Sequence, residues 1–102
     1  MVRKCNLYEG ESPEQNREVF SILFDSGIVR IESIRSWLKR PGEWYDQNED
    51  EWVLLFEGEA DLEIEGNVLH LTRGDHVMIP RHTRHRVLFT SEEAYWIGVF
   101  SS

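Results

Sequence analysis

Hydrophobic and polar positions alternate along most of this chain, which is typical of strands with one buried and one exposed face. The segment 28–37, IVRIESIRSW, alternates between apolar and polar or charged residues over most of its length. The segment 60–66, ADLEIEG, alternates strictly and places Leu62 and Ile64 on one face. Further short apolar runs occupy 52–58, 68–71, 76–80, 85–90 and 95–100. We expect each of these segments to be a strand.

Turn-forming residues separate the apolar runs and keep each of them short. They stand in the triplets Asp25-Ser26-Gly27, Arg40-Pro41-Gly42, Glu65-Gly66-Asn67 and Arg73-Gly74-Asp75. The triplet at 65–67 predicts a hairpin, because Gly and Asn tolerate a positive φ. About seven to nine short strands with few helix signals predict an all-β fold, an antiparallel sandwich or barrel.

The N-terminal segment, residues 1–27, leaves two structures open. Ser12 could cap a helix that begins at Pro13, and Gly27 could end it. The run 18–24, EVFSILF, is rich in the β-branched and aromatic residues that strands favour. We therefore expect an added strand in preference to a short helix.

The length and the single cysteine narrow the class of protein. A chain of 102 residues corresponds to one domain, with a barrel core over about 28–100. Cys5 has no partner for an internal disulfide, which fits a reducing compartment. The first residues lack the apolar region of a signal peptide, and no apolar run could span a bilayer. We therefore expect a cytoplasmic protein.

Acidic residues outnumber basic ones, and the two kinds are unevenly placed. The net charge of −8 argues against a nucleic-acid or membrane partner. Residues 43–65 carry ten acids and no base, whereas residues 69–90 carry four Arg, four His and one acid, Asp75. The two segments could lie side by side and neutralise each other, or both could be solvated faces.

Two segments resemble the paired signature motifs of the cupin superfamily. In the first, Glu51 is followed by six residues and then Gly58. The second, GDHVMIPRHTRHRV, contains Pro80 and, after four more residues, His85. The resemblance covers roughly residues 42–87 and implies a small jelly-roll barrel, the double-stranded β-helix of cupins. It places Glu51 at the carboxylate ligand and His85 at the last histidine ligand of a cupin metal site.

The first motif departs from the pattern of metal-binding cupins, which usually carry a His-any-His pair shortly before the glutamate. Counted with four intervening residues, the two positions hold Trp44 and Asp46; counted with three, they hold Tyr45 and Gln47. Neither alignment supplies a histidine. The resemblance therefore implies a reduced metal set: Gln47, Glu51 and His85.

The register of this motif decides which side chains face the interior. Tyr45 and Gln47 share one face of an extended segment, and Trp44 and Asp46 share the other. We prefer Tyr45 and Gln47 inward. A neutral amide is a weaker ligand than imidazole, so Zn, Fe, Ni or Mn should bind weakly here. A carboxylate inside a barrel is costly unless it is paired or metal-bound, which supports a partner for Glu51.

Three further side chains are candidate contacts to a small molecule: Trp44, Tyr45 and Arg84. Trp44 is expected at the mouth of the barrel, and Arg84 could bind an anionic ligand bidentately or pair with nearby acids. His82 stands where the family often carries glycine. It lies either on a surface turn or beside His85 in a two-histidine, one-carboxylate triad.

Three functions remain open from the sequence. The resemblance implies oxygenase or isomerase chemistry at a divalent metal; the alternatives are a metal-free site for a sugar or organic acid, and a barrel whose pocket is vestigial. Whether the protein is an enzyme is undecided. We also predict a homodimer, because EVFSILF and YWIGVF offer apolar edges that would otherwise invite aggregation.

Overall fold

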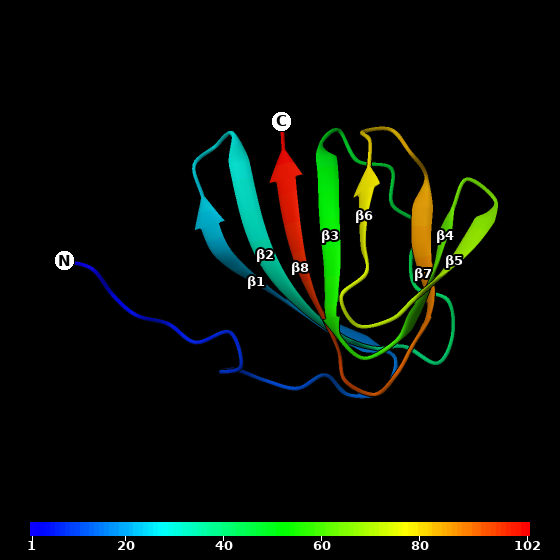
Figure 1. The fold of residues 1–102 in the computed structure, drawn as a ribbon, viewed down its shortest axis with the longest axis horizontal. Coiled ribbons are helices and arrows are strands. Elements are labelled where there is room, and N and C mark those ends of the chain that lie inside the picture. The colour runs from blue at the N-terminus through cyan, green and yellow to red at the C-terminus, as the bar shows by residue number, and fades with distance from the viewer.

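The computed structural model describes residues 1–102 as eight strands without a helix, and hence without any helix that could cross a membrane. The strands are β1 (Arg17–Asp25), β2 (Val29–Trp37), β3 (Asp50–Glu57), β4 (Ala60–Ile64), β5 (Asn67–Leu71), β6 (His76–Ile79), β7 (His85–Thr90) and β8 (Ala94–Ser101). They form a five-stranded sheet, β1-β2-β8-β3-β6, and a three-stranded sheet, β5-β4-β7, as Figure 1 shows. Every named pairing is antiparallel, which confirms the predicted jelly-roll barrel.

Alternate residues of the strands point between the two sheets and form the core. Buried positions recur at every second residue of β3 and β8, although both segments are largely continuous apolar runs in the sequence. The core residues, all about 90% buried or more, are Ile34, Val53, Leu55, Ala60, Leu62, Leu71, Ile79, Ala94 and Trp96. Both sheets contribute, so the core joins the two layers.

Residues 17–25 form a strand, β1, and not the helix that Ser12 and Pro13 could have started. β1 pairs with β2 from Arg17 opposite Trp37 to Asp25 opposite Arg30, with one irregularity. The β-branched and aromatic residues of this segment favour a strand paired with β2 over a helix.

β8 is a central strand, and this corrects the prediction that YWIGVF offers a free edge. It pairs with β2 on one side and with β3 on the other, and Trp96 lies opposite both Ile34 and Leu55. In this central position the backbone N–H and C=O groups along both edges of β8 form hydrogen bonds, while alternate side chains of the strand belong to the core. The free edges of the large sheet are therefore β1 and β6.

The hairpin between β4 and β5 turns at Glu65 and Gly66, whose φ angles are 46° and 83°. Two central residues with positive φ are typical of a type I′ turn. Asn67 already belongs to β5. The predicted hairpin is present, with glutamate rather than asparagine in the left-handed position.

The acidic and basic segments lie side by side, one of the two arrangements that their charges allow. Five ion pairs join them, two from arginine and three from histidine. The arginine pairs are Asp50 with Arg81 at 3.2 Å and Glu63 with Arg86 at 2.8 Å. The histidine pairs are Asp61 with His70 at 2.6 Å, Asp46 with His82 at 3.4 Å and Glu51 with His85 at 3.4 Å. β4 and β7 are neighbours in the small sheet, which places Glu63 opposite Arg86.

The N-terminal segment is anchored on the outer face of the large sheet by Arg35. Arg35 is only 7% exposed, and its guanidinium lies 4.9 Å from the ring centroid of Tyr95. Its terminal nitrogens donate to the carbonyl oxygens of Leu7, Glu9, Gly10 and Glu11 at 2.9 to 3.3 Å. Four carbonyl dipoles thus surround a buried cation that has no carboxylate partner among these contacts.

Candidate functional site

A cavity of about 360 Å³ lies between the two sheets. This volume lies within the range of small-molecule sites. The apolar and aromatic part of its wall consists of Phe20, Ile34, Tyr45, Val53, Leu62, Ile79, Val87, Trp96 and Phe100. The polar part consists of Glu18, Arg30, Glu32, Gln47, Glu51 and His85. A mostly apolar wall with a few convergent polar groups is typical of a ligand-binding pocket.

His85 and Glu51 face each other inside this cavity. His85 is the first residue of β7 and Glu51 the second residue of β3, in different sheets, and the two residues are only 5% and 7% exposed. The Nε2 atom of His85 lies 3.4 Å from Oε1 of Glu51, which is longer than a well-formed hydrogen bond. The structure thus brings together the two residues that the cupin resemblance singled out.

The other ring nitrogen of His85 fixes the orientation of the imidazole. Nδ1 lies 2.8 Å from the carbonyl oxygen of Thr83, and only a protonated nitrogen can donate to a carbonyl. In the neutral ring, Nε2 therefore carries the free lone pair that faces Glu51. Burial acts to lower the pKa of His85, but the Glu51 carboxylate and the Thr83 carbonyl outweigh it, and the pKa lies above its ordinary value.

Tyr45 and Gln47 both line the cavity, in the register that the sequence favoured. Tyr45 forms a short antiparallel bridge with His85, in which the two backbones exchange hydrogen bonds of 2.8 and 3.0 Å. Their rings stack with centroids 5.8 Å apart. Burial, and then the carboxylate of Glu18, raise the pKa of the Tyr45 hydroxyl. The bridge sets the register, so Gln47, two residues on, faces the same way.

Trp44 and Arg84 lie outside the cavity wall, which differs from the expectation that Trp44 lines the mouth. The Trp44 ring contacts two guanidinium groups, Arg84 at 4.0 Å and Arg86 at 4.2 Å from its centroid. Strand alternation turns Trp44 away from Tyr45, and the cation–π contacts hold it there. These contacts hold the loop before β3 against the start of β7 and the residue that precedes it.

His82 lies on a surface turn, so the two-histidine triad is absent. Its side chain is 63% exposed, and Nδ1 lies 3.4 Å from an Asp46 carboxylate oxygen. Its φ is 58°, in the left-handed region that glycine adopts most readily. The backbone conformation therefore explains a frequent glycine at this position of the motif.

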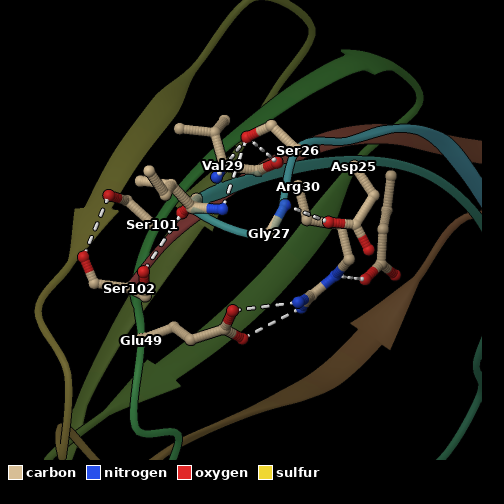
Figure 2. A network of polar contacts seen from close by, with 10 residues as sticks. Asp25, Ser26, Gly27, Val29, Arg30, Glu49, Ser101 and Ser102 are labelled. Atoms are coloured by element: carbon tan, nitrogen blue, oxygen red, sulfur yellow. Dashed lines mark hydrogen bonds and ion pairs between the residues drawn. The ribbon is translucent and has the colours of Figure 1, made fainter.

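Sequence reasoning missed the polar side chains that β1 and β2 contribute to the cavity. Arg30 and Glu32 lie on the inner face of β2, and Glu18 lies on that of β1. Arg30 binds Glu49 through two hydrogen bonds of 2.9 and 3.0 Å, which Figure 2 shows, and its Nε donates to Glu32. The alternation in IVRIESIRSW contained the signal, because Arg30 and Glu32 share a face with Ile34, which is a core residue.

Three buried polar atoms lack a hydrogen-bond partner: Oε1 of Gln47, Oε1 of Glu51 and Nε1 of Trp96. All three side chains belong to the wall of the cavity. Buried polar groups are nearly always paired, and leaving one unpaired costs roughly 1 to 3 kcal/mol. These atoms are therefore the places where a bound molecule or ion would gain most.

Two of the residues present, His85 and Glu51, have the spacing expected for ligands of one divalent ion. Ligand atoms held about 2.1 Å from one ion lie roughly 3 to 3.5 Å apart, and Nε2 of His85 and Oε1 of Glu51 are 3.4 Å apart. Nowhere do three or more His, Cys, Asp or Glu side chains converge, so a third protein ligand would have to be the amide of Gln47, whose unpaired Oε1 belongs to the same cavity wall.

Comparison with protein families gives a match to the cupin domain family, Cupin_2, over residues 39–100. The matched part contains both segments that resemble the cupin motifs, together with the strands β3 to β7 and nearly all of β8. No curated protein matches the sequence.

Several solved structures share the fold over most of the chain. A candidate mannose-6-phosphate isomerase from Ralstonia eutropha JMP134 is 31% identical, with a TM-score of 0.84 and 99% of each chain covered. A Cupin 2 conserved barrel domain protein from Salinispora arenicola is 18% identical, with a TM-score of 0.79, and covers 100% of this chain and 90% of its own. KdgF from Halomonas sp. is 20% identical, with a TM-score of 0.76 over 82% of this chain and 77% of its own. At the lower identities the likeness extends to the fold alone.

Proposed function

Because this chain belongs to the cupin domain family, we propose that its barrel binds a small polar molecule in the cavity between the sheets. The observation that carries the proposal is the set of unpaired buried polar atoms on Gln47, Glu51 and Trp96. A ligand that pairs with them recovers hydrogen bonds that the protein alone leaves unmade.

A thermal-shift screen of small sugars, amines and organic acids tests this proposal. A ligand that binds only the folded state raises the melting temperature in proportion to the logarithm of its concentration. We expect Gln47→Leu to weaken the best ligand about fivefold, because one hydrogen bond contributes roughly 1 kcal/mol. Gln15→Leu, an exposed glutamine in the segment before β1, is the matched control and should leave binding unchanged. A screen without any hit would contradict the proposal.

A second candidate is a metal-dependent form of the same site, with Gln47, Glu51 and His85 as ligands. The observation in its favour is the Nε2 lone pair of His85, held toward Oε1 of Glu51 by the bond from Nδ1 to Thr83. A bound divalent ion would supply Lewis-acid or oxygen-activating chemistry, the basis of isomerase or oxygenase function in this form. With two strong ligands and one amide, we expect weaker binding than at a site with three histidines.

Metal content of protein purified without an affinity tag tests the second candidate. We expect Zn, Fe, Ni or Mn at near one ion per chain after incubation, and its loss in His85→Ala, because imidazole is the strongest neutral ligand of the set. His82→Ala removes an exposed histidine outside the cavity and should retain the ion. Protein that stays free of metal in the presence of all four ions would rule this form out.

The chain's own residues also allow proton transfer within the cavity. His85 and Glu51 are buried and face each other, so a ligand placed between them would meet an imidazole and a carboxylate together. Such an acid–base pair suits an isomerisation, and the Ralstonia eutropha relative is named as a candidate isomerase of mannose-6-phosphate.

We propose that the barrel forms a homodimer through β1, in the cytoplasm, where the exposed Cys5 would stay reduced. β1 is an edge strand with four large apolar residues that are 49 to 64% exposed: Phe20, Ile22, Leu23 and Phe24. A long apolar edge of this kind favours pairing with another chain.

Sedimentation equilibrium should therefore give twice the chain mass of 12.1 kDa. Leu23→Lys is expected to shift the protein toward monomer, because a charge on the edge opposes apolar contact and strand pairing. Val68→Lys, on the edge strand β5 of the other sheet, is the control. Wild-type protein that sediments as a monomer would refute the dimer.

A further inference from the structure

Carboxylates outnumber free cations on the wall of the cavity. Glu18, Glu32 and Glu51 line it, and its cationic groups are Arg30 and His85. Arg30 is already occupied, since its Nε donates to Glu32 and its two terminal nitrogens donate to both oxygens of Glu49 (Figure 2). An anionic ligand could gain this guanidinium only by displacing Glu49 from a bidentate pair.

The other arginines near the loop before β3 are also unavailable inside the cavity. Arg81 is bound to Asp50, with its backbone N–H 2.9 Å from a carboxylate oxygen. Arg84 and Arg86 lie against Trp44, outside the cavity wall. The wall therefore has no guanidinium free to hold a phosphate or a carboxylate.

The unpaired buried atoms specify what a ligand must offer. Glu51, only 7% exposed, and Gln47 each present an oxygen without a donor, so the ligand must carry N–H or O–H groups. Trp96, only 3% exposed, presents an N–H without an acceptor, which a hydroxyl oxygen would satisfy. An ammonium group together with hydroxyl groups supplies both kinds of partner.

Aromatic rings complete the environment that organic cations favour. Phe20, Tyr45, Trp96 and Phe100 line the cavity. The guanidinium carbon of Arg30 lies 4.4 Å from the centroid of the Phe100 ring, so one cation already rests on an aromatic face of this wall. Cation–π contacts strengthen where the cation is withdrawn from water.

From the charge balance, the unpaired acceptors and the aromatic wall together, we propose that the cavity binds a small hydroxylated organic ammonium ion, and disfavours sugar phosphates and organic acids. This inference rests on the proposed function, namely that the cavity binds a small molecule, and it narrows the ligand to one charge class.

Two matched sets of compounds test the charge class. Glucamine, sorbitol and gluconate share a six-carbon skeleton, and ethanolamine, ethylene glycol and glycolate share a two-carbon skeleton; in each set the members are cationic, neutral and anionic. Affinities are measured by calorimetry on EDTA-treated protein at about 0.15 M salt, where general attraction to the chain's net charge of −8 is largely screened. We expect the ammonium member of at least one set to bind at least tenfold more tightly than the neutral member, and the anion to show no binding.

Substitutions in the cavity wall test whether its carboxylates cause the preference for the ammonium compound. Glu51→Gln and Glu18→Gln should each lower the ratio of ammonium to neutral affinity about tenfold, because each removes a negative charge from the wall and keeps an amide oxygen as an acceptor. Glu18 lies on the edge strand β1, so its variant remains informative if Glu51→Gln fails to fold. Glu92→Gln removes an exposed charge between β7 and β8 and should have no effect.

Each possible result decides the inference. An anion that binds as tightly as the amine, or an amine that binds no more tightly than the neutral compound, overturns the ammonium preference and leaves small-molecule binding intact. Amines in both sets that fail to bind overturn the preference as well. Equal loss of amine binding in Glu92→Gln would assign the selectivity to net charge, which also overturns it.

Discussion

Replacing Gly58 with alanine is expected to destabilise the fold by about 2 to 5 kcal/mol, and to lower the melting temperature by roughly 10 °C or more. Gly58 has a φ of 88°, where alanine costs about 1 to 2 kcal/mol. A β-carbon there would also lie 2.5 Å from Oγ of Ser91 and 2.7 Å from the carbonyl oxygen of Glu93. Ser91 cannot move away freely, because its Oγ accepts the backbone N–H of Glu59. Denaturant unfolding of the variant measures the loss.

Gly27→Ala is a matched control for this substitution. Gly27 has the same φ of 88°, and a β-carbon on it would meet nothing within 4 Å. It should therefore show the conformational cost alone, without the steric one. If the two variants were equally stable, the close contact of Gly58 with the turn before β8 would not be the reason for glycine at this position.

The second large effect is expected at Arg35, where alanine should destabilise the protein by about 2 to 4 kcal/mol and release the N-terminal segment. Hydrogen bonds to a charged donor contribute more than neutral ones, and this guanidinium contacts the carbonyl oxygens of four residues between Leu7 and Glu11. The substitution also removes its contact with the Tyr95 ring. Hydrogen exchange should accelerate at residues 7–11 well before the strands are affected.

Two further variants separate charge from shape at this position. Arg35→Lys keeps the charge but loses the planar fork that contacts several carbonyls at once, so we expect a smaller but clear loss. Arg17→Ala removes an exposed arginine at the start of β1 and should leave exchange at residues 7–11 unchanged. Unaltered exchange in Arg35→Ala would mean that other contacts hold the segment.

The strands could be predicted because alternation is a local property of the sequence. The period of two in ADLEIEG predicts both a strand and its buried face, and the apolar run YWIGVF predicts a further strand. Strand order is not local, and for this reason the apolar composition of YWIGVF suggests an edge although the strand lies between β2 and β3. The sequence of a single strand does not indicate which other strands will form hydrogen bonds with its backbone.

The candidate site was predictable as far as the motif spacing reached. The resemblance to the cupin motifs singles out Glu51 and His85. Alternation places Tyr45 and Gln47 on one face, and the preference for this face as the inner one agrees with the cavity wall. Glu18, Arg30 and Glu32 were missed, because charged residues in an alternating strand are ordinarily on the solvent side. Trp44 was expected at the mouth, but the two guanidinium groups that hold it elsewhere come from a distant strand.

The central place of β8 has a consequence for the order in which the chain can fold. β1 and β2 form one hairpin, β3 and β6 another pair, and only β8 joins them into a single sheet (Figure 1). During synthesis, β2 and β3 therefore present unpaired inner edges until residues 94–101 have left the ribosome. The contacts of β8 with β2 and β3 join residues that are distant in sequence, so closure is slow compared with hairpin formation. The nascent chain is most exposed to aggregation and chaperone binding in this interval, which ends when β8 completes the large sheet.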